Sequence, residues 1–419
     1  MNNIKINIIN KYIFIMMFLS IFLISYYVRE PIFKSLASIN IFFLLTLTFY
    51  IVINRNSINS IMFLYIVFLI IYVCIVDYLG NHDSISSIVR NIGMFFLPLF
   101  LVTVKRKSVE FKDIFLSSLK TINIFVIIIF IVGIIDIFIG FSIMKFVGTS
   151  IAPLLNVWIE DNAKLISYRY TSYMGHPLFT KELFIYFFLL NNIYYKKYKE
   201  KLLSGIIITS ISLIGVLLTG SKVGIILILL CIIGTQSKKG KFKCAIASLI
   251  LVIIVYTMGF FNTVLLRFQS GSLTTGRSEG WEYIMNYNFI KYKIFTGYGE
   301  SLHSLLGSVV GESCATAGLE YPLRILLYKY GLFCLSMIVI CIIIYPIVCL
   351  LKNKEFYVLF AFIIKLIDVN TYNGLIFKPD NVILFVLFTY ILLSICNVNN
   401  KKNLMKEFDY CKECIKPSQ

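Results

Sequence analysis

The run KTINIFVIIIFIVGIIDIFIGFSIMK, residues 120–145, indicates what class of structure this chain forms. Asp136 is the one charged residue between its two flanking lysines. A helix that crosses a bilayer needs about 20 consecutive apolar residues, and this run supplies them. The whole chain has the same character, because 59% of its 419 residues are hydrophobic and only 14% are charged. An average soluble domain carries about 25% charged residues. We therefore expect an all-α polytopic membrane protein.

Other segments resemble this run and bring the prediction to about twelve transmembrane helices. Seven are uncharged between flanking charged residues: 11–29, 34–55, 55–77, 201–222, 243–267, 329–352 and 380–401. Four are shorter or carry a charge near one end: 90–105, 177–195, 222–238 and 356–367. No tandem repeat or low-complexity linker interrupts the pattern.

The orientation follows from the basic residues, which give the chain a net charge of +18. Dense lysine and arginine runs, such as 105–107 and 238–243, recur at every second loop. Cytoplasmic loops carry such an excess, so both termini are expected in the cytoplasm. A basic soluble domain long enough to bind nucleic acid is not expected.

This topology divides the chain into six parts. They are 1–143 (N-terminal transmembrane helices), 144–177 (first outer segment), 178–265 (central transmembrane helices), 266–323 (large extracytoplasmic loop), 324–397 (C-terminal transmembrane helices) and 398–419 (cytoplasmic tail). In the large loop, Trp281, Ile284, Met285 and Asn288 share one helical face. We expect this loop to contain interfacial helices in the headgroup layer.

Arginine is distributed unlike lysine in this topology. Of eight arginines, only Arg55 and Arg106 fall inside. The others fall outside or at the outer boundary: Arg29, Arg90, Arg169, Arg267, Arg277 and Arg324. The planar guanidinium binds phosphate oxygens in pairs, whereas lysine acts as a point charge. The enrichment indicates a phosphate bound at the outer face; chance and interfacial snorkelling are the alternative.

Four short motifs follow one another in the second half of the chain. They are RYTSYMGHPLFTKE (169–182), LLTGSKVGIILIL (217–229), TGRSEGWEYIMNYNFIKYKIFTGYGE (275–300) and LEYPLRILLYKYGLF (319–333). In this order they resemble the family of O-antigen ligases and Wzy-type polysaccharide polymerases. Arg277 and Trp281 match its Arg-x-x-x-Trp element, residues 297–299 match Gly-x-Gly, and Gly331 begins its last element.

The resemblance implies a glycosyltransferase of the bacterial inner membrane. It would extend O-antigen or capsular polysaccharide, moving the growing glycan from undecaprenyl pyrophosphate onto a new lipid-linked repeat unit. Its partners would be this lipid-linked oligosaccharide, membrane lipids, and a chain-length regulator and a flippase. No metal or other cofactor is implied. Lys222 stands where the family has arginine, and Glu320-Tyr321 replace His-Asn, which favours a polymerase over a ligase. A ligase and a lipid-linked oligosaccharide flippase or other transporter remain the alternatives.

Six residues are the candidate site. Arg169, Lys222, Arg277 and Arg324 are predicted to bind the pyrophosphate, and Glu320 and His176 are candidates for the general base. Each has a structural alternative: the basic residues could pair with loop glutamates or anchor helix ends, and His176 could cap the helix that begins at Pro177.

Three ionisable residues of the predicted spans also carry open alternatives. Asp136 lies inside a span, where such residues are often functional, or it could pair with a neighbouring helix. Lys365 and Asp368 could form an ion pair near a helix end.

Overall fold

The computed structural model describes residues 2–153, 169–235, 277–286, 290–311, 315, 318–376 and 379–396. All regular structure in these ranges is helical and none of it is strand, apart from one isolated antiparallel bridge between Ile58 and Val104. Helices satisfy their own backbone hydrogen bonds, as a lipid environment requires. The expected all-α class is confirmed for the described part of the chain.

Five helical stretches are long and apolar enough to cross a membrane, counted over the described ranges. They are Ser60–Gly80, Ile85–Thr103, Ser108–Phe138 (α6), Pro322–Lys352 and Pro379–Cys396 (α20). Three of them are composite, and their parts are α4 (Ser60–Ile75), η3 (Val76–Gly80), α5 (Ile85–Asn91), η4 (Ile92–Phe96), η5 (Leu97–Thr103), α17 (Pro322–Val339), η7 (Ile340–Ile344) and α18 (Tyr345–Lys352). The pair α1 (Asn2–Phe22) and α2 (Tyr26–Phe33), bent by 77°, supplies a sixth if counted as one span. The chain is therefore a membrane protein by length and composition.

The remaining long helices are shorter or less apolar. They are α3 (Ile41–Ile53), α9 (Pro177–Tyr198), α10 (Gly205–Leu218), α11 (Lys222–Thr235) and α19 (Phe356–Asn370). A helix lies within each predicted span except 243–267, which falls outside the described residues. The helical segments were thus located from the sequence, while the number of twelve crossings stays a prediction.

Two helices form the centre of the bundle. In α20, 94% of the apolar window is buried, against 33% in α6. The side chains of α9 are buried without a gap from Phe179 to Asn191. The two helices touch, since the Tyr186 and Phe388 rings are in tilted contact with centroids 4.5 Å apart. Helices that are buried on all sides lie inside a large bundle, so this pair belongs to its centre.

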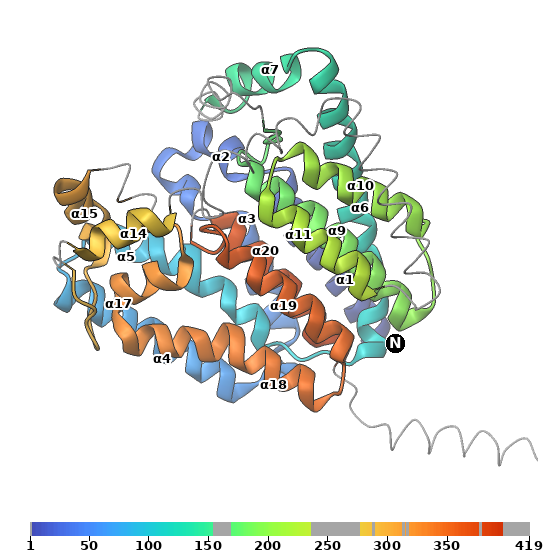
Figure 1. Cartoon of the computed structure of the whole chain (residues 1–419). Coiled ribbons are helices and arrows are strands. Elements are labelled where there is room, and N and C mark those ends of the chain that lie inside the picture. Colours follow the sequence, from blue (N-terminus) through green and yellow to red (C-terminus); the bar gives the residue numbers. More distant parts are fainter. Residues whose placement is uncertain are drawn as a thin grey trace, which may run out of the picture.

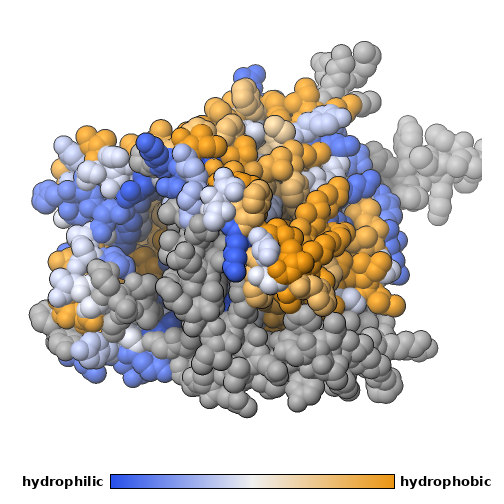
Figure 2. All heavy atoms as spheres, turned by 90° about the horizontal axis from the view of Figure 1, so that it is seen from above, coloured by the Kyte–Doolittle hydropathy of each residue, from blue (hydrophilic) through white to orange (hydrophobic). Residues whose placement is uncertain are grey.

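The bundle has two distinct ends (Figure 1). Helices α5, α14 (Arg277–Asn286) and α15 (Leu302–Val310) lie at one end, which we call the cavity end. The start of α1 and the end of α18 lie at the opposite end, which we call the basic end. Figure 2 shows apolar side chains over much of the middle, with hydrophilic ones gathered toward both ends. This banding is the pattern that a bilayer requires.

The segment that contains α14 and α15 has a small hydrophobic core of its own. Ile284, Leu302, Leu306 and Leu319 are buried together, and Tyr328 of α17 closes the cluster. Trp281 packs on Tyr328, with ring centroids 5.2 Å apart. On the predicted face of α14, Trp281 and Ile284 point into this core, Met285 is 42% exposed, and Asn288 is outside the described residues. The described residues of α14 and α15 therefore pack as a small cluster at the cavity end.

A buried ion pair connects the bent pair α1–α2 to the central helix. Arg29 Nη2 donates to Asp380 Oδ1 over 3.0 Å, and the two side chains are 1% and 4% exposed. Asn40 donates to the same carboxylate oxygen over 3.2 Å. Arg29 is one of the arginines expected at the outer boundary. In this structure it is buried, and its partner is the carboxylate of Asp380 inside the bundle.

Candidate functional site

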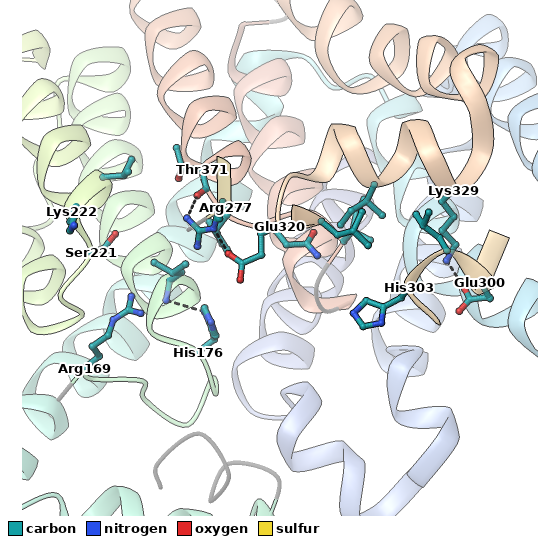
Figure 3. Close-up of a pocket in the computed structure, with 18 of the residues that line it drawn as sticks. Arg169, His176, Ser221, Lys222, Arg277, Glu300, His303, Glu320, Lys329 and Thr371 are labelled. Carbon is teal, nitrogen blue, oxygen red and sulfur yellow. Dashed lines mark hydrogen bonds and ion pairs between the residues drawn. The ribbon is translucent and has the colours of Figure 1, made fainter. Parts of the chain in front are cut away.

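A cavity of about 560 Å³ opens at the cavity end (Figure 3). The starts of α9, α11, α14 and α17 and the end of α19 converge on it. Figure 3 shows Arg277 and Glu320 in its middle, Arg169, His176, Ser221 and Lys222 on one side, and Glu300, His303 and Lys329 on the other. Five of the six predicted site residues line this cavity: Arg169, His176, Lys222, Arg277 and Glu320.

Arg169 and Lys222 are held by the tight junction between α10 and α11. Gly220 has φ +60°, a conformation that glycine adopts without strain. The chain therefore reverses within the three residues between α10 and α11, and the Ser221 hydroxyl accepts the Gly224 N–H over 3.1 Å to cap α11. Arg169 Nε donates to the carbonyl of Thr219 over 2.9 Å. This junction fixes two cations on one wall of the cavity.

Arg277 begins α14 and reaches across the middle of the cavity. Its Nε donates to Glu320 Oε2, and its Nη1 donates to the Thr371 carbonyl over 3.0 Å. The guanidinium is 16% exposed and the Glu320 side chain 36%. The structural alternative for Arg277 is thus realised, but with Glu320 as the partner, 43 residues along the chain, and not with a neighbouring glutamate. The ion pair faces the cavity.

His176 lies at the start of α9, where it belongs to both the helix end and the cavity wall. Its Nδ1 accepts the Leu178 N–H over 3.2 Å, so it caps the helix, and the ring also lines the cavity. The ring stacks on Tyr372 with an interplanar angle of 10°. A neutral imidazole that accepts at Nδ1 carries its proton on Nε2. In this state His176 is a hydrogen-bond donor toward the cavity.

The second wall of the cavity carries a mixed cluster that the sequence did not reveal. The Glu300 carboxylate accepts hydrogen bonds from Arg90 (3.1 Å), Asn91 (2.9 Å) and Lys329. Burial raises the pKa of Glu300, but the charge and hydrogen bond of Lys329, with Asn91 and Arg90, outweigh this and hold the pKa below its usual value. These groups come from three separate segments of the chain, so no local motif marks them.

Arg324 has a different environment from the other predicted residues. Its Nη1 donates to the Gly318 carbonyl over 3.0 Å, and the guanidinium stacks on Trp281 and Tyr321, 4.1 Å and 4.5 Å from the ring centroids. It does not line the described cavity. Its partners are thus two aromatic rings and a backbone carbonyl, and both its predicted phosphate contact and its alternative as an interfacial anchor remain predictions.

A network of buried charges lies directly beneath the cavity, between α9 and α19. Lys181 pairs with Asp368, and Lys365 pairs with Glu182. All four residues are fully buried. Tyr372, which lines the cavity, donates to Glu182 and so connects the network to the cavity floor.

The sequence signal for this network was partly visible. Lys365 and Asp368 do approach each other, to 4.0 Å between Nζ and Oδ2, as the spacing suggested. Lys181 and Glu182 stood within the first motif, but their partners lie almost 190 residues away. By contrast, Asp136 has a local role, because its Oδ1 accepts the Ile143 N–H over 2.7 Å at the start of α7 (Ser142–Ser150).

The arrangement suits a negatively charged group that ends in phosphate. Arg169, Lys222 and Arg277 supply positive charge, and Ser221 and His176 supply smaller polar groups. Across the described ranges, no three His, Cys, Asp or Glu side chains form a group that could hold a metal ion. Comparison with known protein families, curated proteins and solved structures finds no match to this chain.

Proposed function

We propose that this protein is a polymerase of lipid-linked oligosaccharide repeat units. It would transfer the growing glycan of an O-antigen or capsular polysaccharide from undecaprenyl pyrophosphate to a new lipid-linked repeat unit. The observation that carries the proposal is the convergence of Arg169, Lys222 and Arg277 on one cavity at an end of an apolar bundle. A lipid diphosphate has its headgroup at such an end and its tail in the bilayer.

The proposed reaction replaces one bond at the anomeric carbon by another. The acceptor sugar hydroxyl attacks C1 of the donor glycan, and the bond from C1 to the diphosphate oxygen breaks. The bonding electron pair leaves with the diphosphate, and the hydroxyl proton passes to a base. Fixed cations stabilise the charge that develops on the departing diphosphate without reorganising during the step. No nucleotide is consumed, because the lipid diphosphate is the activating group.

Glu320 is the proposed base. Its pairing with Arg277 would keep the carboxylate occupied until the diphosphate binds. A diphosphate with two negative charges competes with one carboxylate for the guanidinium. In the proposed cycle it replaces Glu320 on Arg277, and the released carboxylate accepts the hydroxyl proton. His176, which presents Nε2–H in its capping state, is proposed to donate to the leaving diphosphate. Arg324 is proposed to contact the lipid headgroup from outside the cavity.

The proposed topology has twelve crossings with both termini in the cytoplasm of a bacterial inner membrane. The cavity end then faces outward, and the 266–323 loop covers the donor lipid. The expected partners are a flippase that delivers repeat units and a chain-length regulator that sets polymer size.

Reconstitution tests the proposed activity directly. Purified protein in vesicles is given the lipid-linked repeat unit together with lipid A core as an alternative acceptor, and products are separated on a gel. A ladder of products on the carrier lipid supports the polymerase. Transfer of a single glycan to lipid A core without a ladder supports a ligase, and movement of the repeat unit across the bilayer without new bonds supports a flippase. Either of these two results overturns the proposal.

A further inference from the structure

A second, smaller pocket lies at the basic end, far along the bundle from the cavity. It has a volume of about 70 Å³. Polar residues from three parts of the chain line it: Lys105, Arg106, Tyr345, Asn353 and Ser394. The proposed polymerase reaction uses none of them.

Arg106 is the unusual member of this pocket. Only 6% of it is exposed. Its Nη1 lies 3.5 Å from Glu110, a carboxylate that is 40% exposed. Within the described residues its Nε and Nη2 atoms are buried and make no well-aligned hydrogen bond, and the Tyr50 hydroxyl lies beside the guanidinium within hydrogen-bonding reach. A guanidinium stays charged at any physiological pH, so it cannot escape this cost by losing a proton.

The backbone around Arg106 is fixed before any ligand arrives. Ile58 and Val104 form the isolated bridge. The Asn59 N–H donates to the Thr103 carbonyl over 2.8 Å, and the Lys105 N–H donates to the Ser57 carbonyl over 2.8 Å. These bonds hold the loop after η5 against η2 (Arg55–Ser57), so the arginine is aimed inward by its main chain.

A second polar group in the pocket is also buried without a well-aligned hydrogen bond. The Ser394 hydroxyl, on α20, is buried and makes no well-aligned hydrogen bond among the described residues, although the Tyr390 hydroxyl lies within reach of it. A hydroxyl and a guanidinium edge that share one pocket can both donate to the same oxyanion. Exposed Lys105 adds a third positive or donating group at the entrance. Glu110 pairs with Arg106 through Nη1, not through Nε or Nη2.

We propose that this pocket binds a phosphate group through Arg106 Nε and Nη2, Ser394 and Lys105. The pocket volume fits one tetrahedral oxyanion, and a planar guanidinium binds two of its oxygens in parallel. The phosphate comes from the headgroup of an anionic phospholipid or from free phosphate, and both share this chemistry. Because the site lies at the end opposite the cavity, it belongs to the leaflet that does not present the donor lipid.

Binding to the full-length protein tests the site. The midpoint of thermal unfolding is measured in nanodiscs of phosphatidylcholine with or without 20–30% phosphatidylglycerol, and in detergent with or without inorganic phosphate. We expect at least one of these phosphates to stabilise the wild type. Phosphatidylglycerol alone identifies a lipid headgroup, and stabilisation by both identifies a site open to small anions. No stabilisation by either overturns the proposal.

Substitutions assign the binding to this pocket. Arg106→Met keeps the length of the side chain and is expected to weaken apparent phosphate affinity by about tenfold or more. Arg55→Met is the matched control, because Arg55 is an exposed arginine at the same end and does not line the pocket. Equal affinities in the two variants would overturn the proposal.

Two milder variants keep the test decisive if Arg106→Met fails to fold. Ser394→Ala and Lys105→Gln each remove one donor and are expected to weaken binding by a few-fold. Unchanged binding in both would again overturn the site. Because none of these residues lines the cavity, polymerase activity in the same variants is expected to persist in a fixed lipid. Failure of the phosphate site is therefore distinguishable from failure of the proposed polymerase.

Discussion

Arg29 and Arg277 are both paired with a carboxylate, yet their surroundings give them different capacities. The Arg29 and Asp380 side chains are 1% and 4% exposed, so nothing from solution can replace the carboxylate. Arg277 and Glu320 are 16% and 36% exposed and face the cavity. An exposed pair is worth little by itself and exchanges partners easily, whereas a buried one holds two elements together. Arg277 is therefore the arginine suited to ligand exchange.

The first prediction concerns the geometry of Arg277. Arg277→Lys retains the charge but loses the fork that reaches Glu320 and Thr371 together. We expect glycan chain extension to fall by about tenfold or more, with the protein still present in the membrane. Gel analysis of the polymer ladder measures this. Arg55→Lys, at the opposite end, is the control, and an unchanged ladder in Arg277→Lys would remove Arg277 from the proposed site.

The second prediction concerns acid stability at the second wall of the cavity. Because the pKa of Glu300 is lowered in the folded state, its ionised form stabilises the fold above the ordinary carboxylate range. This contribution is lost as the pH falls through the lowered pKa. We expect Glu300→Gln to lower the melting temperature at pH 7 and to flatten its fall toward acid pH.

Asp83 provides a control, because its contribution to stability is expected to change with pH in the opposite direction. Its carboxylate accepts the Glu300 N–H over 3.1 Å, but burial raises its pKa above the usual value. Asp83 therefore favours folding more when protonated, and its contribution declines as the pH rises through the raised pKa. Asp83→Asn is expected to remove this decline and to leave the acid-sensitive contribution of Glu300 in place. Identical pH profiles for the two variants would contradict both assignments.

At the scale of the element, sequence periodicity located the helices because apolar length is a local property. It could not supply their partners. The pairing of Arg277 with Glu320, the cluster around Glu300 and the exclusion of Arg324 from the cavity all depend on contacts between distant segments. The convergence of five predicted residues was foreseeable because motifs at the same ends of successive helices meet at one end of a bundle.

The third prediction concerns the charged network between α9 and α19. Lys365→Met leaves Glu182 buried beside only Tyr372, which is expected to cost about 3–5 kcal/mol of stability. Lys365→Met combined with Glu182→Gln removes both charges and is expected to recover a substantial part of that loss. Unfolding titrations in mixed micelles measure the stabilities of Lys365→Met, Glu182→Gln and the double variant. A double variant as unstable as the sum of the two single changes would show that the pair is not coupled.

At the scale of the whole molecule, the two polar ends and the apolar middle give the bundle an axis but not a direction across the membrane. The direction rests on the placement of lysine runs, which is a statistical rule about loops. Short helices such as α10 and α11 meet at the Gly220 junction, which lines the cavity end, so a pair of them need not be two complete crossings. For this reason orientation has to be measured.

The fourth prediction therefore concerns topology. In a cysteine-free background, Ser308→Cys and Lys201→Cys each introduce one exposed thiol, the first at α15 and the second in the loop before α10. We expect a membrane-impermeant maleimide added to intact cells to label Ser308→Cys and to spare Lys201→Cys. The reverse pattern would place the cavity in the cytoplasm and exclude the proposed donor lipid from it.

The central position of α20 has a consequence for how the protein is made. It follows every other described helix along the chain, so it leaves the ribosome after them, yet they surround it. Until it arrives, Arg29 lacks the carboxylate that neutralises it and α9 lacks the neighbour that Tyr186 contacts. Until α20 is inserted, the earlier helices therefore form a ring that lacks its central member. Any stop codon upstream of Pro379 would leave that ring unfilled and send the product to membrane proteolysis.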